Sequence, residues 1–244
     1  MNKVLTFDST GNTHQGNVRQ LNEDSILSCP SIGLWTVADG MGGHSAGEVA
    51  SQLIVSELSK LAEHEPGFDL VDSVEDALLD INAQLKAHSN EKLNGLTIGS
   101  TVVSLVAYQN VGVVLWVGDS RLYLLRQGKL TQLTKDHSEV QAQIDSGLLT
   151  AEQAESSAIR NVLSRAVGAF DNLQVDVNAM SLQENDMLLL CSDGLYNELS
   201  EDEMIDSMSL ASLEQVSAEL MARCLNSEAK DNVSFILVKA LYER

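Results

Sequence analysis

The chain has 244 residues, of which 44% are hydrophobic and 20% are charged, as is typical of an ordinary globular protein. Fifteen Lys and Arg against 35 Asp and Glu give a net charge of −20, which argues against nucleic acid and anionic membranes as partners. With only two prolines and no low-complexity tract, we expect one compact domain spanning residues 1–244.

The three cysteines, Cys29, Cys191 and Cys224, are odd in number and widely spaced, so neither a disulfide framework nor a zinc site is expected. Cys191 stands inside the apolar run MLLLCS and is predicted to be a buried thiol. The opening stretch MNKVLTFDST has no apolar signal core, and no apolar run approaches membrane-spanning length. We therefore expect a cytoplasmic protein.

The first third of the chain predicts two strands followed by two helices. Apolar strands are expected at residues 4–10 and 34–38, and the second strand ends abruptly at Asp39, where a glycine-rich turn begins. Apolar residues, Val49 among them, then recur at helical spacing from Ala46 to Leu61, and again from Val71 to Leu85. Both segments are predicted to be amphipathic helices whose apolar stripes face a core.

The central part of the chain carries strand patterns. Four apolar runs, STVVSLVAY, VGVVLWVG, RLYLLR and KLTQL, follow one another with short connections. These connections predict an antiparallel meander, and the consecutive apolar residues are typical of strands that are covered on both faces. Two helices before such strands predict sheets that are sandwiched between helices.

Residues 137–170 interrupt the strand pattern and are expected to form an inserted flap. The flap contains short helical pieces, one of them opened by a capping box from Thr150 to Gln153. Beyond it we expect strands at 173–180, 187–191 and 233–238, a capping box at Ser200–Glu203, and a helix from Leu213 to Cys224.

Four aspartates, Asp39, Asp119, Asp193 and Asp231, occupy the same kind of position, where an apolar strand meets a turn. One such aspartate is an ordinary turn residue or helix cap, but four in one sandwich can converge at one edge. Converging carboxylates repel one another unless they are protonated or neutralised by cations. Oxygen ligands without His or Cys favour magnesium or manganese.

The run RQLNEDS adds Arg19, Glu23 and Asp24 to this set. A guanidinium beside metal-bound carboxylates offers a planar fork that matches two phosphate oxygens. The alternative for Arg19 is a surface ion pair with Glu23, which would contribute little to stability. Together the residues point to metal-assisted attack of water on a phosphoester.

The ordered motifs RQLNED, VADGMGGHSAGE, GSTVV, VGDSRLYL, LTKDHS, RNVLSRAVG, CSDGLYNELS and KDNVSFILV resemble the metal-dependent Ser/Thr protein phosphatases, the PPM or type 2C family. The resemblance is strongest to compact bacterial members and covers Arg19 to Val238. It implies an α+β fold, a four-layer αββα sandwich of two mostly antiparallel sheets flanked by helices, with a short flap insertion. It also implies a di-metal site at one end of the sheets.

The resemblance further implies two Mg²⁺ or Mn²⁺ ions per chain. Asp39 would bridge both ions, and Asp193 and Asp231 would complete the first. The second ion would be bound by the carbonyl oxygen of Gly40.

The remaining acidic and polar residues of the motifs would support these ions and the substrate. Glu23 and Asp24 would hold the second ion directly or through water. Asp119, together with Asp193, matches a third, weaker metal site. Arg19 would bind the substrate phosphate, and Asn232 would orient Asp231 or a metal-bound water.

The implied reaction is hydrolysis of phosphoserine and phosphothreonine by a water or hydroxide shared by two metals, with no phosphoenzyme, so Cys191 is not a nucleophile. Many eukaryotic relatives have His directly after the Asp–Gly pair, as the proposed acid for the leaving alcohol. Here that position is Met41, which cannot supply a proton. His44 and His137 are candidates, the alternatives being a helix-start histidine and a structural one; metal-bound water is the default.

Two other functions stay open at this stage, a non-catalytic regulator that binds phosphoproteins and a two-metal hydrolase of small phosphoesters. Pseudo-enzymes usually lose metal ligands, whereas every expected carboxylate is present here. The expected partners are phosphorylated proteins and their Ser/Thr kinase, with no nucleic acid and no membrane, and the protein is expected to be a monomer. Arg160 and Arg165 in the flap either meet phosphopeptides or stabilise the flap itself.

Overall fold

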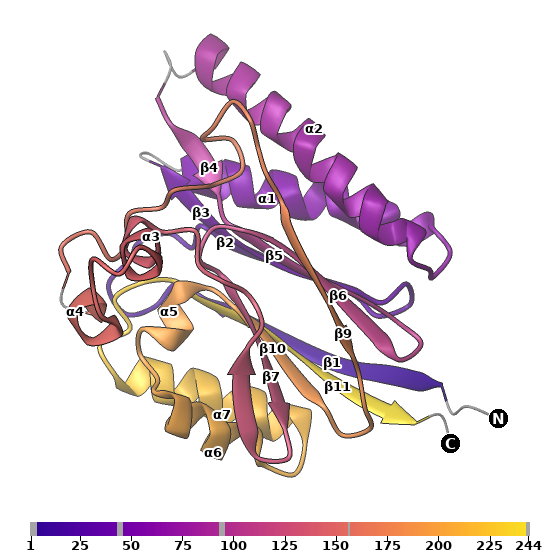
Figure 1. Ribbon diagram of the computed structural model, residues 1–244. Coiled ribbons are helices and arrows are strands. Elements are labelled where there is room, and N and C mark those ends of the chain that lie inside the picture. Colours follow the sequence, from indigo (N-terminus) through magenta and orange to yellow (C-terminus); the bar gives the residue numbers. More distant parts are fainter. Residues whose placement is uncertain (1–3, 43–45, 93–95, 156, 243–244) are drawn as a thin grey trace.

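The computed structural model describes residues 4–42, 46–92, 96–155 and 157–242, and these form a four-layer sandwich (Figure 1). Helices α1 (Ala46–Ser59) and α2 (Asp69–Lys92) cover the outer face of one sheet. Helices α6 (Glu201–Met208) and α7 (Leu213–Asn226) cover the outer face of the other. The αββα architecture implied by the sequence motifs is therefore confirmed.

Both sheets are antiparallel at every strand pair of the described residues. The five-stranded sheet has the order β1-β11-β10-β7-β8, with β1 at Leu5–His14, β11 at Val233–Tyr242, β10 at Met187–Cys191, β7 at Arg121–Arg126 and β8 at Lys129–Gln132. The six-stranded sheet has the order β2-β3-β5-β6-β9, with β2 at Asp24–Cys29, β3 at Leu34–Gly42, β5 at Val102–Tyr108, β6 at Val111–Val117 and β9 at Asp176–Ser181. Its remaining strand, β4 (Ile98–Ser100), pairs with β3.

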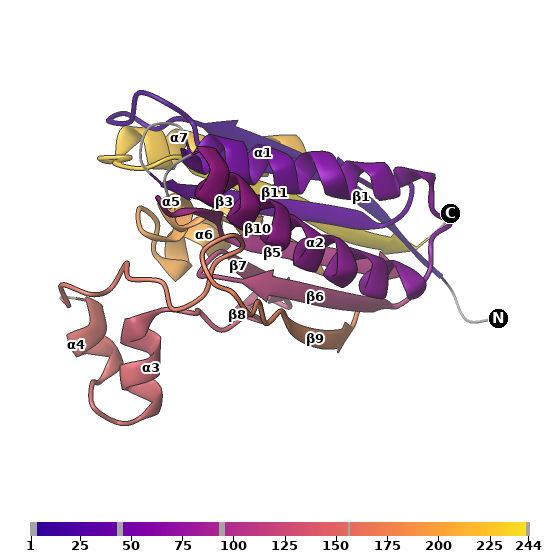
Figure 2. The same ribbon diagram turned by 90° about the horizontal axis from the view of Figure 1, so that it is seen from above.

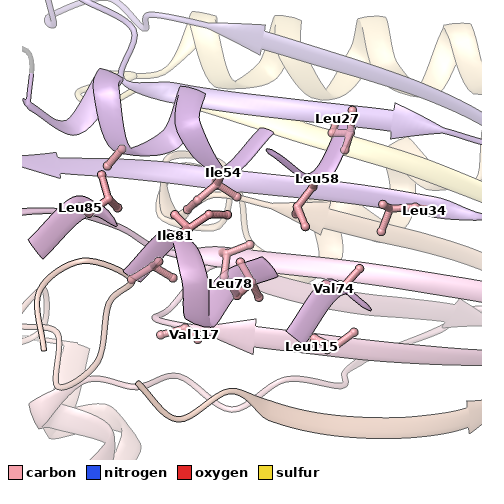
Figure 3. Close-up of a cluster of buried hydrophobic side chains, with 14 of the residues drawn as sticks. Leu27, Leu34, Ile54, Leu58, Val74, Leu78, Ile81, Leu85, Leu115 and Val117 are labelled. Carbon is pink, nitrogen blue, oxygen red and sulfur yellow. The ribbon is translucent and has the colours of Figure 1, made fainter. Parts of the chain in front are cut away.

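Three hydrophobic clusters hold the layers together. One lies between the sheets and includes Trp35 and Ile236, which are fully buried. A second joins α1 and α2 to the six-stranded sheet, where Ile54 and Leu78 meet strand side chains (Figure 3). The third packs α6 and α7 on the five-stranded sheet. Each fully buried Leu or Ile contributes roughly 1.5–3 kcal/mol, so the predicted apolar stripes are the main source of layer cohesion.

Two details of the predicted helices can be checked directly. Val49 was expected in the buried stripe of the first helix but is 44% exposed, so that prediction is wrong. It lines a groove formed by residues of α1 and α2. The capping box at Ser200 and Glu203 is confirmed, since the side chain of each bonds to the backbone of the other.

The predicted meander is wrong at its centre. Strands β5 and β6 pair with each other and β7 pairs with β8, but β6 and β7 belong to different sheets. The link from β6 to β7, which passes from one sheet to the other, begins at Gly118. This glycine has a φ of +105°, and a Cβ there would collide with the side chain of Thr101. Glycine adopts this conformation without steric cost, and the link carries Asp119 to the end of the sandwich.

Strand β3 is longer than predicted, because it continues to Gly42 instead of stopping at residue 38. Asp39 therefore lies inside the strand, where its Cα partner on β2 is Asp24. Beyond it, Gly40 pairs with Ser100 of β4. The extra strand β4 explains this extension, since it supplies hydrogen-bond partners past the end of β5.

The segment between β8 and β9 leaves the sandwich and carries two short helices, α3 (Glu139–Asp145) and α4 (Ala151–Glu155). Figure 2 shows both helices projecting from the body of the molecule. Helix α5 (Asp193–Tyr196) lies at the same end, and the start of β1 and the end of β11 lie at the opposite end (Figure 1). None of the described helices combines the length and apolarity needed to span a bilayer.

Candidate active site

A pocket of about 390 Å³ opens at the end of the sandwich that carries α5 and the flap. Eight of the residues selected from the sequence line it: Arg19, Glu23, Asp39, Gly40, Asp119, Asp193, Asp231 and Asn232. A ninth, Asp24, lies behind the wall and is 6% exposed. His44 falls outside the described residues. The fold thus gathers side chains that are separated by up to 213 positions in the sequence.

The β2–β3 register sets the floor of the pocket. It pairs Asp24 with Asp39, and Asp24 Oδ2 accepts a 2.8 Å hydrogen bond from Ser192 Oγ, one residue before Asp193. The Asp39 backbone is fixed separately, since its carbonyl oxygen accepts bonds from Thr101 N at 2.8 Å and Ser100 Oγ at 2.9 Å. Strand pairing therefore holds Asp24 beside Asp39, and the hydrogen bond from Ser192 ties Asp24 to the segment that carries Asp193.

Gly40 is a position that admits no side chain. Its N–H donates to the carbonyl of Glu23 at 3.1 Å. A Cβ at Gly40 would collide with the carbonyl oxygens of Glu23 and Gly47. The backbone of β3 therefore packs directly against the start of α1.

Arg19 pairs with Asp231 rather than with Glu23, which was the alternative considered from the sequence. Its Nη2 lies 2.7 Å from Asp231 Oδ2, and the Arg19 side chain remains 53% exposed. The guanidinium is therefore bound at the rim of the pocket with part of its donor set facing solvent. Proximity to Asp231 raises the pKa of Arg19 further, so it is a permanent cation.

Asn232 organises the loop that carries Arg19. Its Nδ2 donates to the carbonyl oxygens of Gln15 at 3.0 Å and Leu21 at 2.9 Å, and its Oδ1 accepts from Glu23 N at 2.8 Å. Its own backbone N–H donates to Asp231 Oδ1 at 2.9 Å. One buried side chain thus fixes both ends of the Arg19 loop beside the Asp231 carboxylate.

Two hydrogen bonds that the sequence did not predict connect Asp193 to the flap through Asn197. Asn197 Nδ2 donates to Asp193 Oδ2 at 3.1 Å, and Arg160 Nη2 of the flap donates to Asn197 Oδ1 at 2.7 Å. The spacing of four residues between Asp193 and Asn197 was the available signal, because such side chains face each other on a helix. Asn161, next to Arg160, also lines the pocket; it lies in the motif RNVLSRAVG, but the sequence analysis gave it no role.

Burial and mutual repulsion perturb the carboxyl groups. Burial raises the pKa of Asp39 well above its usual range, and the charges of Asp24 and Asp193 raise it further. Burial, with the Asp193 charge as a smaller cause, raises the pKa of Asp24 and of Asp119 to about 7. Burial and the Asp231 charge raise the pKa of Asp193 to about 6. A cation among these groups would favour their ionised forms.

The donor set fits hard divalent cations. Glu23 Oε1 and Asp24 Oδ1 are buried and have no hydrogen-bond partner among the described residues. An unpaired buried carboxylate oxygen is costly unless something positive binds it. Within the described residues, no three acidic, histidine or cysteine side chains are placed so that they could hold a metal ion by themselves. The all-oxygen chemistry and the two unpaired oxygens suit Mg²⁺ or Mn²⁺.

Met41 and His137, both considered in connection with the leaving-group proton, lie in different parts of the structure. Met41 lines the pocket, and its thioether cannot donate a proton. His137 lies elsewhere, with its ring stacked on Trp116 and its Nδ1 accepting from Gly118 N at 3.1 Å. Arg165 supports that cluster through Asp176 at 2.6 Å. His137 and Arg165 thus brace the base of the flap.

Comparison with known proteins identifies relatives along nearly the whole chain. The model of the protein phosphatase 2C family matches residues 10–241. Serine/threonine protein phosphatase PstP of Mycobacterium tuberculosis is 34% identical over 234 residues, which are 96% of this chain and 45% of PstP. Serine/threonine phosphatase stp of Listeria welshimeri is 35% identical over 237 residues, which cover 93% of each protein. The chain thus spans about half of PstP and nearly all of stp.

Solved structures agree with these matches. PppA, described as a key regulatory component of T6SS in Pseudomonas aeruginosa, superposes with a TM-score of 0.89 at 36% identity, over 98% of this chain and 100% of PppA. The catalytic domain of PstP, solved in complex with two manganese ions, gives a TM-score of 0.88 at 32% identity, over 97% and 99% of the two chains. With its αββα fold and acidic pocket, the chain belongs to the protein phosphatase 2C family of enzymes, among its bacterial members.

Proposed function

We propose that this chain hydrolyses phosphoserine and phosphothreonine in proteins with the help of two Mg²⁺ or Mn²⁺ ions, and that residues 1–244 form its single catalytic domain. The observation that supports the proposal is the pocket itself, where Glu23 and the buried Asp24 behind it have unpaired carboxylate oxygens and the partly exposed guanidinium of Arg19 lies at the rim. The two manganese ions in the PstP catalytic domain support the choice of cofactor.

The cations would lower the pKa of a water molecule and neutralise the phosphoryl oxygens. Asp39, Asp193, Asp231 and the Gly40 carbonyl are the proposed holders of the two ions, with Glu23 and Asp24 supporting the second. Asp119 and Asp193 would hold a third, weaker ion.

The chain's own side chains then bind and orient the phosphate. The planar guanidinium of Arg19 donates hydrogen bonds to two phosphoryl oxygens and stabilises the charge that develops on them. Asn232 keeps the Arg19 loop at the pocket by holding the carbonyls of Gln15 and Leu21. Because Met41 cannot donate a proton, the leaving alcohol takes its proton from water in the pocket, with His44 as the alternative donor.

A polypeptide is the proposed substrate because of the surface beside Arg19. Val18 and Leu21 flank Arg19 and are 65% and 50% exposed, on a loop that Asn232 holds at both ends. Apolar side chains around a phosphate site suit the residues that neighbour a phosphorylated one in a protein. Within this proposal, the enzyme acts as a cytoplasmic monomer and opposes Ser/Thr kinases.

The test of the function is Mn²⁺-dependent phosphate release from three substrates. We expect rapid release from a phosphothreonine peptide, slower release from an aryl phosphate, and none from a cyclic dinucleotide. Binding of the peptide without release would establish the non-catalytic regulator instead. A preference for the aryl phosphate or the dinucleotide would establish the hydrolase of small phosphoesters.

Replacing Arg19 by Ala is expected to lower kcat/KM for the phosphothreonine peptide by about a hundredfold or more, because one fewer cation stabilises the transferring phosphoryl group. Arg19→Lys should recover only part of this loss, since an ammonium cannot form the two-pronged contact. The aryl phosphate should show the same pattern, because the phosphate is common to both substrates. Steady-state kinetics at saturating Mn²⁺ measures these effects.

Arg223 offers a matched control, because it is also partly exposed and pairs with one carboxylate, Glu219, at 2.6 Å. Arg223→Ala should leave kcat/KM unchanged, and neither variant should shift unfolding by more than about 1 kcal/mol. Equal kinetic losses in both variants would remove Arg19 from the proposed phosphate site.

A further inference from the structure

The loop that carries Asp231 contains a residue in an unfavourable backbone conformation. Ala229 has a φ of +40° and is fully buried. Residues with a Cβ rarely adopt this left-handed conformation unless their surroundings impose it. Because Ala229 lies only two positions before Asp231, whatever holds Ala229 also sets the direction from which the Asp231 carboxylate enters the pocket.

Glu198 supplies the contacts on the N–H side of this loop. Its Oε1 accepts from Lys230 N at 3.2 Å, and the backbone N–H of Ala229 also bonds to this carboxylate. Its Oε2 accepts from Ser227 Oγ at 2.6 Å. Successive backbone N–H groups around a left-handed residue form a concave anion site, and here a side chain of the same chain occupies it.

Asn17 holds the opposite side of the loop. Its backbone N–H donates to the Ala229 carbonyl at 2.8 Å, and its Nδ2 donates to the Leu225 carbonyl at 3.0 Å. Hydrogen bonds therefore hold the loop from two directions. The segment that carries Arg19 donates to a loop carbonyl, and Glu198 accepts from loop N–H groups.

Glu198 also contacts the helix that carries Asp193. Glu198 lies two residues beyond the end of α5, and its backbone N–H donates to the Leu195 carbonyl at 3.2 Å. Helix α5 begins at Asp193 and packs closely on β11, since a Cβ at Gly194 would collide with the Asn232 carbonyl. Glu198 thus ties the segment of one pocket carboxylate, Asp193, to the loop of another, Asp231.

We propose that Glu198 is a positioning residue that sets the placement of Asp231 relative to Asp193, and thereby the affinity of the pocket for a divalent cation. This inference rests on the proposed metal-dependent function. Glu198 touches neither substrate nor cation and acts only through the loop of residues 227–231. Burial would raise the pKa of Glu198, but its hydrogen bonds from Ser227 and the loop backbone outweigh burial and lower it, which keeps the group ionised at neutral pH.

The test compares Mn²⁺ binding, measured by isothermal titration calorimetry, between the wild-type chain and the Glu198→Ala variant. Residues that orient metal ligands typically change metal affinity by 10–100-fold, and we expect Mn²⁺ affinity at least about tenfold weaker in the variant. In kinetics, the Mn²⁺ concentration for half-maximal activity should rise by a similar factor. The kcat at saturating Mn²⁺ should stay close to that of the wild-type chain.

Glu203→Ala provides the matched control. Glu203 also accepts a backbone N–H through its carboxylate, from Ser200 N at 2.9 Å, but it caps α6, and among the described residues the hydrogen bonds of its carboxylate go to Ser200. This variant should lose stability while keeping wild-type Mn²⁺ affinity. Equal losses of Mn²⁺ affinity in both variants, or none in Glu198→Ala, would overturn the proposal.

A second substitution tests the route of the effect. Glycine adopts a positive φ without steric cost, so Ala229→Gly in the Glu198→Ala background should restore most of the Mn²⁺ affinity. Failure of this rescue would mean that Glu198 does not act through the loop conformation. Calorimetric binding needs no turnover, so a wild-type chain that binds Mn²⁺ but releases no phosphate would refute the proposed function alone. A wild-type chain that binds no Mn²⁺ would refute both.

Discussion

The Asp39→Asn variant is expected to lose phosphatase activity by at least about a thousandfold while remaining folded. Burial raises the pKa of Asp39, and the charges of Asp24, Asp193, Asp119 and Asp231 all raise it further. An amide cannot supply the negative charge that holds cations in such a cluster, and loss of one well-placed charge contact costs about 3–4 kcal/mol or more in the transition state. Phosphate release from the phosphothreonine peptide measures the loss.

The fold should survive because Asp39 is anchored through its backbone. Its carbonyl accepts from Thr101 N and Ser100 Oγ, and these contacts do not involve the carboxylate. Removing one of several repelling charges should even raise the melting temperature of the metal-free chain. Asp202→Asn, at an exposed position in α6, serves as the control and should retain full activity. Wild-type turnover in Asp39→Asn would refute the assignment of this pocket as the catalytic site.

The metal-free chain is expected to become less stable as the pH rises from about 4 to about 8. The pKa values of Asp24 and Asp119 are raised to about 7 in the folded state, from about 4 in the unfolded chain. Between these values the folded chain binds more protons than the unfolded chain, so raising the pH favours unfolding. The penalty is small below pH 4 and is fully present above pH 7.

The pKa shift of Asp119 alone gives the order of magnitude of this loss of stability. A rise of about three pKa units corresponds to about 4 kcal/mol at neutral pH, an order-of-magnitude value for Asp119 alone. Urea unfolding in EDTA at about pH 5 and pH 8 measures the slope, and the Asp119→Asn variant should show a shallower one. Saturating Mn²⁺ should remove most of the loss at pH 8, because a cation that binds only the folded state stabilises it. Stability that rises with pH in EDTA would contradict the prediction.

Most secondary structure was predictable because it depends on local patterns. The strand at 187–191 was predicted with the bounds that the structure has, and the apolar stripe from Leu213 to Cys224 forms the buried face of α7. Cys191 is fully buried, as its apolar neighbours indicated. Asp119 and Asp193 were selected because each follows an apolar run, and both line the pocket.

Pairings between distant segments were not predictable in the same way. The split between β6 and β7 depends on the backbone at Gly118, while the apolar runs on both sides look alike. The partner of Arg19 is Asp231, 212 positions away, whereas the sequence offered only the nearby Glu23 as a candidate. A pattern of apolar residues shows that a strand is buried, but it does not show which strand lies beside it or in which register.

The sequence by itself therefore determined which strands and helix faces are buried, the acidic composition of the site and the kind of cation that would suit it. Only the tertiary structure decided that Asp24 lies opposite Asp39 and that Asn232 fixes the Arg19 loop. The role of Glu198 also depended on it, because the strained conformation of Ala229 has no signature in the sequence. The physical reason is that side-chain type and spacing encode burial locally, whereas the geometry of a site depends on strand register and backbone conformation set by long-range packing.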